Sequence, residues 1–308
     1  LDALLLDGEP VTVRGRPTLE LLNVMTEIQS PLQRVIFTPG RRWNPWLALS
    51  ESLWLLAGRE DVAALKPYNS RIGEFSDDGE TLYGAYGYRI ADQIQELIEL
   101  LKKDPSSRQA VLSIWDRRDL TAITKDKPCN NLLYFKLRNG SLHLTVINRS
   151  NDLHWGLYAV NICQFSFLLE YLAARLGCAV GTQTHVSNSL HVYTDALGDS
   201  ITRRMIDSEH EPMPEPSLPE QPWFTPEGLK NISHADFIED CNRALEGAEA
   251  SPRLSSLIFA GEFLRAYRLK GFQRYSLLKG DLASAYRDWT RAAFMFLGSP
   301  SIEHTSFS

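Results

Sequence analysis

The stretch from Lys127 to Tyr193 organises the fold, and it reads KPCNNLLYFKLRNGSLHLTVINRSNDLHWGLYAVNICQFSFLLEYLAARLGCAVGTQTHVSNSLHVY. Residues 132–138 and 141–148 within it have the composition of two strands. Asn139-Gly140 joins them and is a strong hairpin signal, because both residues accept positive φ. We therefore expect a β-hairpin near the middle of the chain.

An apolar helix is expected after this hairpin. Residues 161–176 are apolar over much of the helix circumference, which is typical of a helix buried at the centre of a domain. Gly177 follows as a plausible C-cap. Two short strand-like segments come next, at residues 182–186 and 190–193. The pattern predicts strands packed against one central helix.

Further elements flank this centre. Residues 45–58 and 90–103 have the apolar spacing of helices, and residues 108–115 alternate like a strand. Six prolines between Pro212 and Pro226 indicate a linker or an extended arm, and the pattern beyond them is helical. We therefore divide the chain into a main, catalytic domain at residues 1–207, a proline-rich linker or arm at 208–232 and a helical C-terminal extension at 233–308.

The composition is that of an ordinary globular protein. The chain has 308 residues, of which 44% are hydrophobic and 23% are charged, enough for a sizeable core. The formal net charge of −6 argues against a broad surface for nucleic acid, so no nucleic-acid partner is expected. No apolar run has the length that a bilayer requires, so no membrane partner is expected either.

The chain start and the cysteines bear on localisation and metal binding. Leu1 is followed by neither a basic flank nor a signal-peptide pattern, and the missing methionine suggests trimming. The cysteines show no CxxC and no zinc-ligand rhythm. We therefore expect a cytoplasmic protein with no metal site and four reduced thiols: Cys129, Cys163, Cys178 and Cys241.

One cysteine has the surroundings of a nucleophile. Cys129 follows Pro128 in a polar loop, with Lys125 and Lys127 close by in sequence. Positive charge lowers the pKa of a thiol, so we expect a depressed pKa and an exposed thiolate. A soft thiolate is suited to conjugate addition to an electrophilic carbon. The other three cysteines are expected to be buried spacers.

Other polar residues complement this thiol. Arg149 and Ser150 follow the second hairpin strand and suit an anion, because a guanidinium fork matches phosphate oxygens. Asn161 opens the central helix with an amide that could bind the edge of a base. Glu51 lies in an apolar helix, where a carboxylate with a raised pKa can pass protons. A nucleophile, a phosphate clamp and a base-binding amide are therefore predicted in one region.

With these motifs the chain resembles the thymidylate synthase family, which includes the deoxypyrimidine-nucleotide hydroxymethylases. The resemblance covers residues 45–195, roughly half of the chain, in order and spacing. It implies an α/β (α+β) fold with a mixed sheet and a central buried helix, here followed by a helical C-terminal extension. The matching motifs are Glu51-Ser52-Leu53-Trp54-Leu55-Leu56-Ala57-Gly58, Tyr86-Gly87, Asp104-Pro105-Ser106-Ser107-Arg108 before Trp115, Pro128-Cys129, Arg149-Ser150-Asn151-Asp152 with Gly156, Asn161-Ile162 and His191-Val192-Tyr193.

The resemblance implies folate-dependent one-carbon transfer to C5 of a pyrimidine deoxynucleotide, with 5,10-methylenetetrahydrofolate as co-substrate. Cys129 would add to C6 of the base and make C5 nucleophilic. Arg149 and Ser150 would hold the 5′-phosphate, and Arg149 would help to keep Cys129 ionised. Arg108 resembles the arginine that this family supplies from the partner subunit, so a homodimer is implied.

The same resemblance assigns the remaining site residues. Arg14 or Arg16 would add a phosphate contact, although solvated surface charge explains this arginine-rich loop equally well. His191 and Tyr193 would bind the ribose hydroxyl. Glu51 and Tyr86 would handle proton transfer near O4 of the base. Asp152 would bind the pterin, and Gly156 and Ile72 would lie along the folate side.

Asn161 bears on the choice of base. Its amide offers one donor and one acceptor, which complement N3–H and O4 of uracil. Family members that act on dCMP place an aspartate there, so the resemblance favours dUMP. The interval from Gly156 to Asn161 is one residue longer than is usual in the synthases.

Departures from the family bear on the product. Asn130 stands where synthases usually have histidine, Ile72 or a neighbour replaces a tryptophan near the transferred carbon, and Gln109 replaces a second arginine. The C-terminal tail that closes over the substrate has no match. A methyl product needs hydride transfer in a closed, dry site, whereas entering water gives a hydroxymethyl group. We therefore favour a deoxyuridylate hydroxymethylase.

Other interpretations stay open from sequence. A true thymidylate synthase with a different lid is one, and dCMP, UMP or CMP as substrate is another. A catalytically silent nucleotide-binding scaffold belongs to a different class. The complete set of Glu51, Cys129, Arg149, Asp152 and Asn161 argues against the scaffold.

Overall fold

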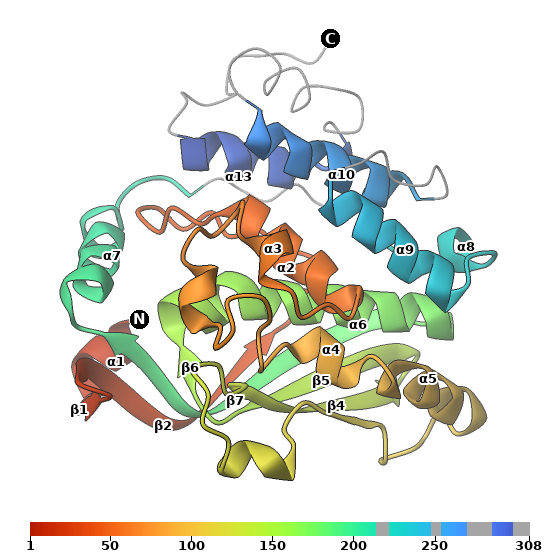
Figure 1. Ribbon diagram of the computed structural model, residues 1–308, viewed down its shortest axis with the longest axis horizontal. Coiled ribbons are helices and arrows are strands. Elements are labelled where there is room, and N and C mark those ends of the chain that lie inside the picture. The colour runs from red at the N-terminus through yellow and green to blue at the C-terminus, as the bar shows by residue number, and fades with distance from the viewer. Residues whose placement is uncertain (214–221, 248–253, 270–284, 298–308) are drawn as a thin grey trace.

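A seven-stranded mixed sheet forms one layer of the protein (Figure 1). The computed structural model describes residues 1–213, 222–247, 254–269 and 285–297. The strand order is β1-β2-β7-β5-β4-β3, with β6 also beside β7; β7 runs parallel to β5 and β6, and the other pairs are antiparallel. The strands are β1 (Glu9–Val13), β2 (Arg16–Ile28), β3 (Val111–Ser113), β4 (Asn130–Arg138), β5 (Ser141–Asn148), β6 (Asn151–Asp152) and β7 (Ala179–Tyr193).

Two tight turns set the register of this sheet. Asn139 and Gly140 have φ values of 50° and 76° and connect β4 to β5, as the hairpin signal predicts. Arg14 and Gly15, with φ values of 51° and 76°, connect β1 to β2 in the same way. The loop expected around Arg14 is therefore a two-residue turn, and Arg16 already belongs to β2.

Two strand predictions need correction. The segments 182–186 and 190–193 are parts of the single strand β7, which pairs with β2 over most of its length. The breaker-like residues between them do not end the strand, because neighbours on both sides supply backbone hydrogen bonds. The strand predicted at residues 108–115 is only β3, which pairs with β4 alone at the edge of the sheet.

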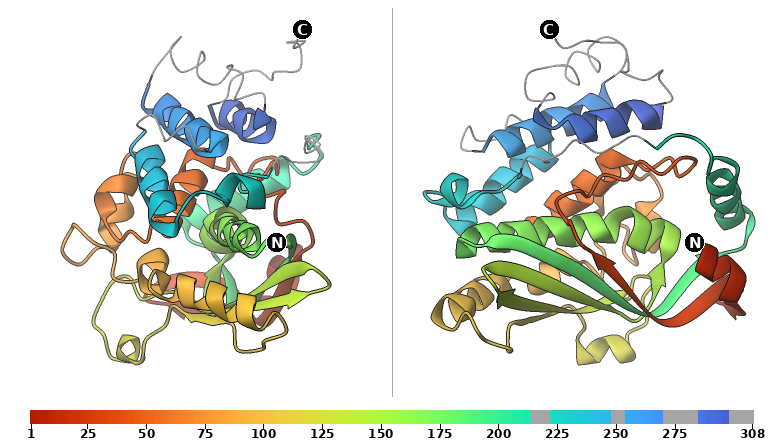
Figure 2. Two further views of the ribbon diagram at one scale, coloured as in Figure 1. Left: turned by 90° about the vertical axis from the view of Figure 1, so that its right-hand side faces the viewer. Right: turned by 180° about the vertical axis from the view of Figure 1, so that it is seen from behind.

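The predicted central helix lies across the sheet (Figures 1 and 2). It consists of α6 (Ile162–Leu176), which ends at Gly177 with φ 68°, and of a preceding π-helix, η3 (Leu153–Asn161). Together they form a helix long and apolar enough to cross a membrane, contrary to the expectation that no apolar run has this length. Its apolar stretch is almost entirely buried inside the protein, as in a core helix.

The described helices of the C-terminal part cover α2 (Pro45–Leu56), which itself lies on α6 (Figure 2). Trp46 of α2 is fully buried, donates from Nε1 to the carbonyl of Phe263 at 2.8 Å and stacks on the Phe263 ring. One hydrophobic cluster runs from the sheet through α6 and α2 into these helices. The C-terminal helices among the described residues are α8 (Pro226–Leu229), α9 (His234–Leu245), α10 (Ser255–Arg268) and α13 (Arg287–Leu297).

A buried ion pair joins the proline-rich segment to the central helix. Glu170 of α6 accepts from Arg34 at 2.5 Å, and its other oxygen accepts from the backbone N–H groups of Trp223 and Phe224. Part of that segment, residues 214–221, lies outside the described residues, so the division at 207 and 233 stays a prediction. The contacts of Glu170 nevertheless tie residues on both sides of the first boundary into one core.

The remaining helices are short or peripheral. Residues predicted as one helix at 90–103 divide between α4 and α5, and the predicted helix at 45–58 is α2 followed by Gly58 with φ 64°. The remaining described helices are α1 (Asp2–Asp7), α3 (Val62–Leu65), η1 (Ile72–Phe75), α4 (Tyr86–Ile90), α5 (Gln93–Lys103), η2 (Arg117–Leu120) and α7 (Ala196–Asp207).

Candidate active site

Cys129 and Arg149 meet where β4 begins and β5 ends. The N–H of Arg149 donates to the carbonyl of Cys129 at 3.0 Å, which continues the ladder of the two strands. The Arg149 guanidinium donates to the carbonyls of Lys127 and Pro128, both at 2.9 Å, and reaches Cys129 Sγ at 3.6 Å. Arg149 therefore fixes the loop that carries the thiol and places a positive charge beside the sulfur.

The expected depression of the Cys129 pKa is wrong. Burial raises the pKa of the thiol above its ordinary value, and the charge of Arg149 lowers it only in part. The two neighbouring lysines do not help, because their Nζ atoms are held elsewhere: Lys125 donates to the carbonyl of Ser76, and Lys127 donates to that of Leu120. The thiolate must therefore form in a half-buried site, with Arg149 as its nearest cation.

Glu51 projects from α2 toward α6, where Gln164 donates its side-chain amide to the carboxylate. Burial raises the pKa of Glu51 to about 7, the Gln164 hydrogen bond lowers it in part, and the charge of Asp126 raises it further. A carboxyl group that titrates near neutral pH can both give and take a proton. The apolar sequence around Glu51 predicted a raised pKa, and the structure agrees with that prediction.

Tyr86 lies at the start of α4, with its ring stacked on Phe165 of α6 at a centroid distance of 6.0 Å. Burial holds the pKa of its phenol well above 10, and hydrogen bonding with the Asn130 side chain and the Cys129 backbone opposes this shift. Asn130 is fully buried and accepts from the amide of Asn148. Asn130, the residue that departs from the family pattern, thus contacts Tyr86 next to Cys129 in the chain.

Asn161 lies at the end of the π-helix, with its amide turned toward the strands. Its Nδ2 is 3.5 Å from Oδ1 of Asn151, whose own Nδ2 donates to Ser187 at 3.0 Å. Gly156 faces both amides, and a Cβ there would lie 2.7 Å from Asn151 Oδ1 and 3.1 Å from Asn161 Nδ2. Gly156 therefore leaves space for the amide pair, which is a different role from the folate contact that the resemblance implies.

The π-helix explains the longer interval between Gly156 and Asn161. A π turn accommodates one residue more than an α turn, and such turns occur often at functional sites. Tyr158, between the two, has non-helical φ and ψ of −97° and 40°. The additional residue is absorbed in the helix, so that Asn161 still reaches Asn151.

Asp152, His191 and Tyr193 form the next group along the site. Asp152 opens the π-helix and accepts from the N–H groups of His154 and Trp155 at 2.7 and 3.1 Å. Burial raises the pKa of its carboxyl group, and the charge of His191 lowers it in part. His191 packs edge-on against Tyr193, and within the described part of the chain its buried Nδ1 lacks a hydrogen-bond partner. An unpaired buried nitrogen is suited to a ligand hydroxyl.

The other predicted residues lie in more varied places. Arg16 pairs with Asp195 and stacks over the Tyr193 ring at 3.7 Å, and Arg14 is close enough to Cys129 for its charge to lower the thiol pKa. Ser150 is half-buried beside Arg149. Ile72 is buried in the main core, and Arg108 is exposed before β3. Among the described residues no group of three His, Cys, Asp or Glu side chains could hold a metal ion.

Sequence reasoning missed two residues of this site. Gln164 lies one turn after Asn161 on α6, and only its contact with Glu51 reveals its role. Asp126 lies three residues before Cys129, and its charge raises the pKa values of Glu51, Tyr86 and Cys129. In the sequence Asp126 lies between two lysines, so the local pattern indicated only positive charge near Cys129.

Comparison with known proteins agrees with this arrangement. The family model for thymidylate synthase matches residues 14–240, which extends beyond the quoted motifs at both ends. Deoxyuridylate hydroxymethyltransferase of Bacillus phage SP01 is 43% identical over 219 residues, 66% of this chain and 57% of the relative. The enzyme of the same name from Pseudomonas phage M6 is 42% identical over 181 residues, 56% of this chain and 52% of the relative.

A third relative is similar over a longer stretch. Deoxyuridylate hydroxymethyltransferase of Delftia phage PhiW-14 is 31% identical over 285 residues, 87% of this chain and 79% of the relative. The chain spans little more than half the length of the first two relatives. The matched region contains the motifs at Glu51, Cys129, Arg149 and Asn161. The chain belongs to the thymidylate synthase family.

Proposed function

We propose that the protein transfers a one-carbon unit to C5 of dUMP and releases a hydroxymethyl product. The observation that carries this proposal is the Cys129 thiol beside Arg149, in one site with the Glu51 carboxyl and the Asn161 amide. Addition of the thiolate to C6 of the base makes C5 nucleophilic. Glu51 can protonate O4 as this charge develops, because its pKa lies near 7.

The site offers a separate contact for each part of the nucleotide. Arg149 and Ser150, with Arg14 nearby, fit the phosphate, although the Arg149 fork must share its donors with the carbonyls that it already contacts. The Nδ1 of His191, to which no described residue forms a hydrogen bond, fits the ribose hydroxyl, as does the Tyr193 phenol. The Asn161 amide fits the O4 and N3–H edge of uracil.

The surroundings of Asp152 fit methylenetetrahydrofolate. One oxygen of this buried carboxylate caps the π-helix, which holds the group in place for pterin N–H donors. Trp155, which is 47% exposed, follows and offers an aromatic surface for the folate. The co-substrate would supply the methylene group. The chain would hold the pterin at Asp152 and keep it over the base.

The hydroxymethyl product is supported by the names of the three relatives and by local structure. A methyl product would need exclusion of water at the transferred carbon. Here Asn130, hydrogen-bonded by Asn148, stands next to Cys129 where synthases usually have an imidazole, and the carboxyl groups of Glu51 and Asp126 add polar surroundings. The family's name equally supports a thymidylate synthase, which would give dTMP.

One incubation tests these alternatives. The protein is mixed with dUMP and methylenetetrahydrofolate, the nucleotide is read by mass spectrometry and the folate by absorbance. Hydroxymethyl-dUMP with tetrahydrofolate is expected. Methyl product with dihydrofolate would make the protein a thymidylate synthase instead. A Cys129→Ala variant should lose either activity, whereas a silent binding protein would retain its nucleotide affinity in this variant.

A homodimer with shared sites is part of the proposal. The carbonyl of Arg108 contacts Lys136, six residues along β4 from Asn130, which is roughly 20 Å at about 3.3 Å per residue. Arg108 is thus remote from the Cys129 site of its own chain and exposed for a partner. The sheet also presents Leu22 and Met25, 64% and 71% exposed. Mixing inactive Arg108→Ala and Cys129→Ala variants should restore activity if heterodimers with one intact site form.

A further inference from the structure

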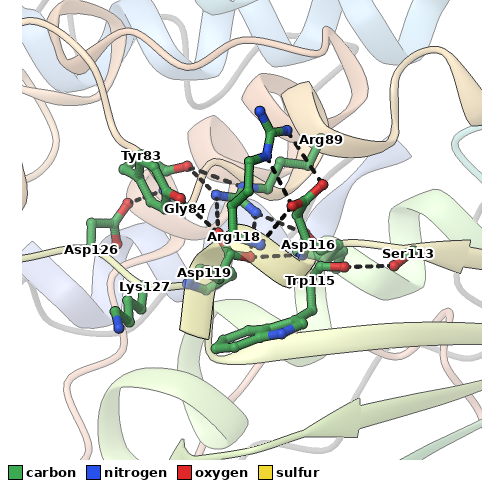
Figure 3. A network of polar contacts seen from close by, with 12 residues as sticks. Tyr83, Gly84, Arg89, Ser113, Trp115, Asp116, Arg118, Asp119, Asp126 and Lys127 are labelled. Atoms are coloured by element: carbon green, nitrogen blue, oxygen red, sulfur yellow. Dashed lines mark hydrogen bonds and ion pairs between the residues drawn. The ribbon is translucent and has the colours of Figure 1, made fainter. Parts of the chain in front are cut away.

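Asp126 is held in place by a peptide group that is itself held from its other side. Its Oδ2 accepts from the N–H of Gly84 at 2.8 Å, and the carbonyl of the same peptide, that of Tyr83, accepts two hydrogen bonds from Arg89 at 2.9 and 3.1 Å. Figure 3 shows this sequence of contacts from Arg89 through Tyr83 and Gly84 to Asp126. Charges at both ends of a peptide strengthen each hydrogen bond.

The turn that provides this N–H is held by a buried carboxylate. Asp119 is fully buried and accepts from Arg89 at 2.7 Å and from the Tyr83 hydroxyl at 2.8 Å (Figure 3). Gly84 allows the close approach, because a Cβ there would lie 2.6 Å from the carbonyl of Asp126 and 3.0 Å from the nitrogen of Pro128. The chain thus uses a dedicated network to hold one carboxylate in the loop of the nucleophile.

Asp126 lies within electrostatic reach of the reacting groups, three residues before Cys129. Its charge raises the pKa values of the Glu51 carboxyl, the Tyr86 phenol and the Cys129 thiol. Arg89, Arg149 and Asp77 are further charged groups that act on Asp126. Among the described residues, the Gly84 N–H is the hydrogen bond that its carboxylate receives, so acceptor capacity remains.

Burial raises the pKa of both Glu51 and Asp126, but the groups that contact the two carboxyls differ. Gln164 donates to Glu51, whose pKa of about 7 lets it keep a proton for O4. Burial also raises the pKa of Asp126, while the Gly84 N–H, Arg89 and Arg149 favour its charged form. A pair of carboxyl groups in one site with different environments commonly divides into an acid and a base.

We propose that Asp126 is the base that takes the proton of the attacking water in hydroxymethylation, which rests on the function proposed above. The water oxygen bonds to the methylene carbon at C5, and the water proton passes to the Asp126 carboxylate. The electron pair of the C5–methylene double bond moves toward O4. Expulsion of Cys129 Sγ from C6 restores the C5–C6 double bond and O4 carbonyl. Tetrahydrofolate has left before this step, and no oxidant or reductant is needed.

Asp126→Asn tests this role in the full chain, because the asparagine oxygen can still accept from Gly84. Enzyme in excess is mixed with 5-tritiated dUMP and methylenetetrahydrofolate for a single turnover. Tritium in water reports loss of the C5 hydrogen, and mass spectrometry reports the hydroxymethyl nucleotide. The variant should release tritium within about threefold of the wild-type rate but form product about 100-fold more slowly, the range for loss of a general base. Added mercaptoethanol should then trap the stranded methylene as a thioether.

Asp77→Asn is the matched control. Asp77 is an exposed carboxylate that anchors the same loop, through Thr124 and the N–H of Lys125; its charge raises the pKa of Asp126, so its removal favours the ionised, basic form of Asp126. This variant should match the wild type in both readouts. Equal loss of tritium release and product in Asp126→Asn would overturn the proposal, and so would unchanged product formation. Absence of tritium release from dUMP by the wild-type protein would instead refute the proposed function, and the role of Asp126 with it.

Discussion

Gln164 of α6 donates its side-chain amide to the Glu51 carboxylate of α2, so a charged group contacts an amide between two helices of the hydrophobic core. The contact stabilises the ionised form, but burial has the larger effect and leaves the Glu51 pKa at about 7. The folded protein therefore holds a proton on Glu51 at pH values where an exposed glutamate has lost it.

This pKa predicts a pH dependence of stability. Between the ordinary value of 4.5 and about 7, the folded state binds more protons than the unfolded chain, so the free energy of unfolding falls as pH rises. The loss attributable to Glu51 is at most about 3 kcal/mol. Glu51→Gln should reduce the fall between pH 5 and pH 8, measured by urea unfolding. Glu80→Gln, at an exposed position, should unfold with the wild-type pH dependence; an equally steep fall in Glu51→Gln would contradict the assignment.

Arg149 is predicted to stabilise the thiolate form of Cys129. Arg149→Ala removes the contact at 3.6 Å and the fork that holds the loop, so the thiol pKa should rise further. Alkylation of Cys129 by iodoacetamide at pH 7.5 should slow about tenfold for each unit of pKa gained. Peptide mass spectrometry separates it from Cys178, whose half-buried thiol serves as an internal reference. Faster or unchanged alkylation of Cys129 would show that Arg149 does not stabilise its thiolate.

The sequence predicted those parts of the fold that depend on local pattern. The hairpin at Asn139-Gly140, the helix ending at Gly177 and the helix after Pro45 follow from backbone preferences and apolar spacing. The length of β7 was not predictable, because pairing on both sides overrides the residues that appear to break it. The π-helix was indicated in the sequence only by the one additional residue between Gly156 and Asn161.

The site was predictable as a set of residue types but not in its electrostatics. Sequence neighbours made Cys129 look activated by Lys125 and Lys127, yet both ammonium groups bind carbonyls of other loops. Burial then determines the direction of the thiol pKa. The position of Asp126 follows only from its hydrogen bond with the N–H of Gly84, which lies 42 positions away in the sequence. Side-chain direction, which no local pattern encodes, decides both outcomes.

Glu170 is predicted to anchor the C-terminal segment to the central helix. Glu170→Gln keeps an acceptor for the N–H groups of Trp223 and Phe224 but leaves the fully buried Arg34 without its counter-charge. Loss of one partner of a buried pair typically costs about 3–5 kcal/mol, measurable by urea unfolding. Glu239→Gln removes an exposed pair with Arg243 and should cost less than about 1 kcal/mol. Similar stabilities of the two variants would mean that the buried pair does not anchor the segment.

Gly156 is predicted to control the position of the base-binding amide. A Cβ at this position would approach Asn151 Oδ1 to 2.7 Å and Asn161 Nδ2 to 3.1 Å, so Gly156→Ala must displace at least one amide. We expect a loss of about tenfold or more in dUMP affinity, since a mispositioned buried hydrogen bond costs about 1–3 kcal/mol. Gly73→Ala is the control, because its Cβ would meet only Val62 at an ordinary 3.8 Å. Calorimetric titration with dUMP compares the two; equal affinities would place the base elsewhere.

Asn161→Asp is predicted to shift the choice of base. The present amide can donate to O4 and accept from N3–H of uracil, whereas a carboxylate can only accept and suits the exocyclic amine of cytosine. The kcat/KM for dUMP should fall by about 10- to 100-fold relative to that for dCMP, because one polar edge is left mismatched. Asn188→Asp changes an exposed amide that contacts Asn23 on the surface and should leave the ratio as in the wild type. An unchanged ratio in Asn161→Asp would show that the π-helix turns a different side chain toward the base, and Asn151, which already shares a hydrogen bond with Asn161, would be the next residue to exchange.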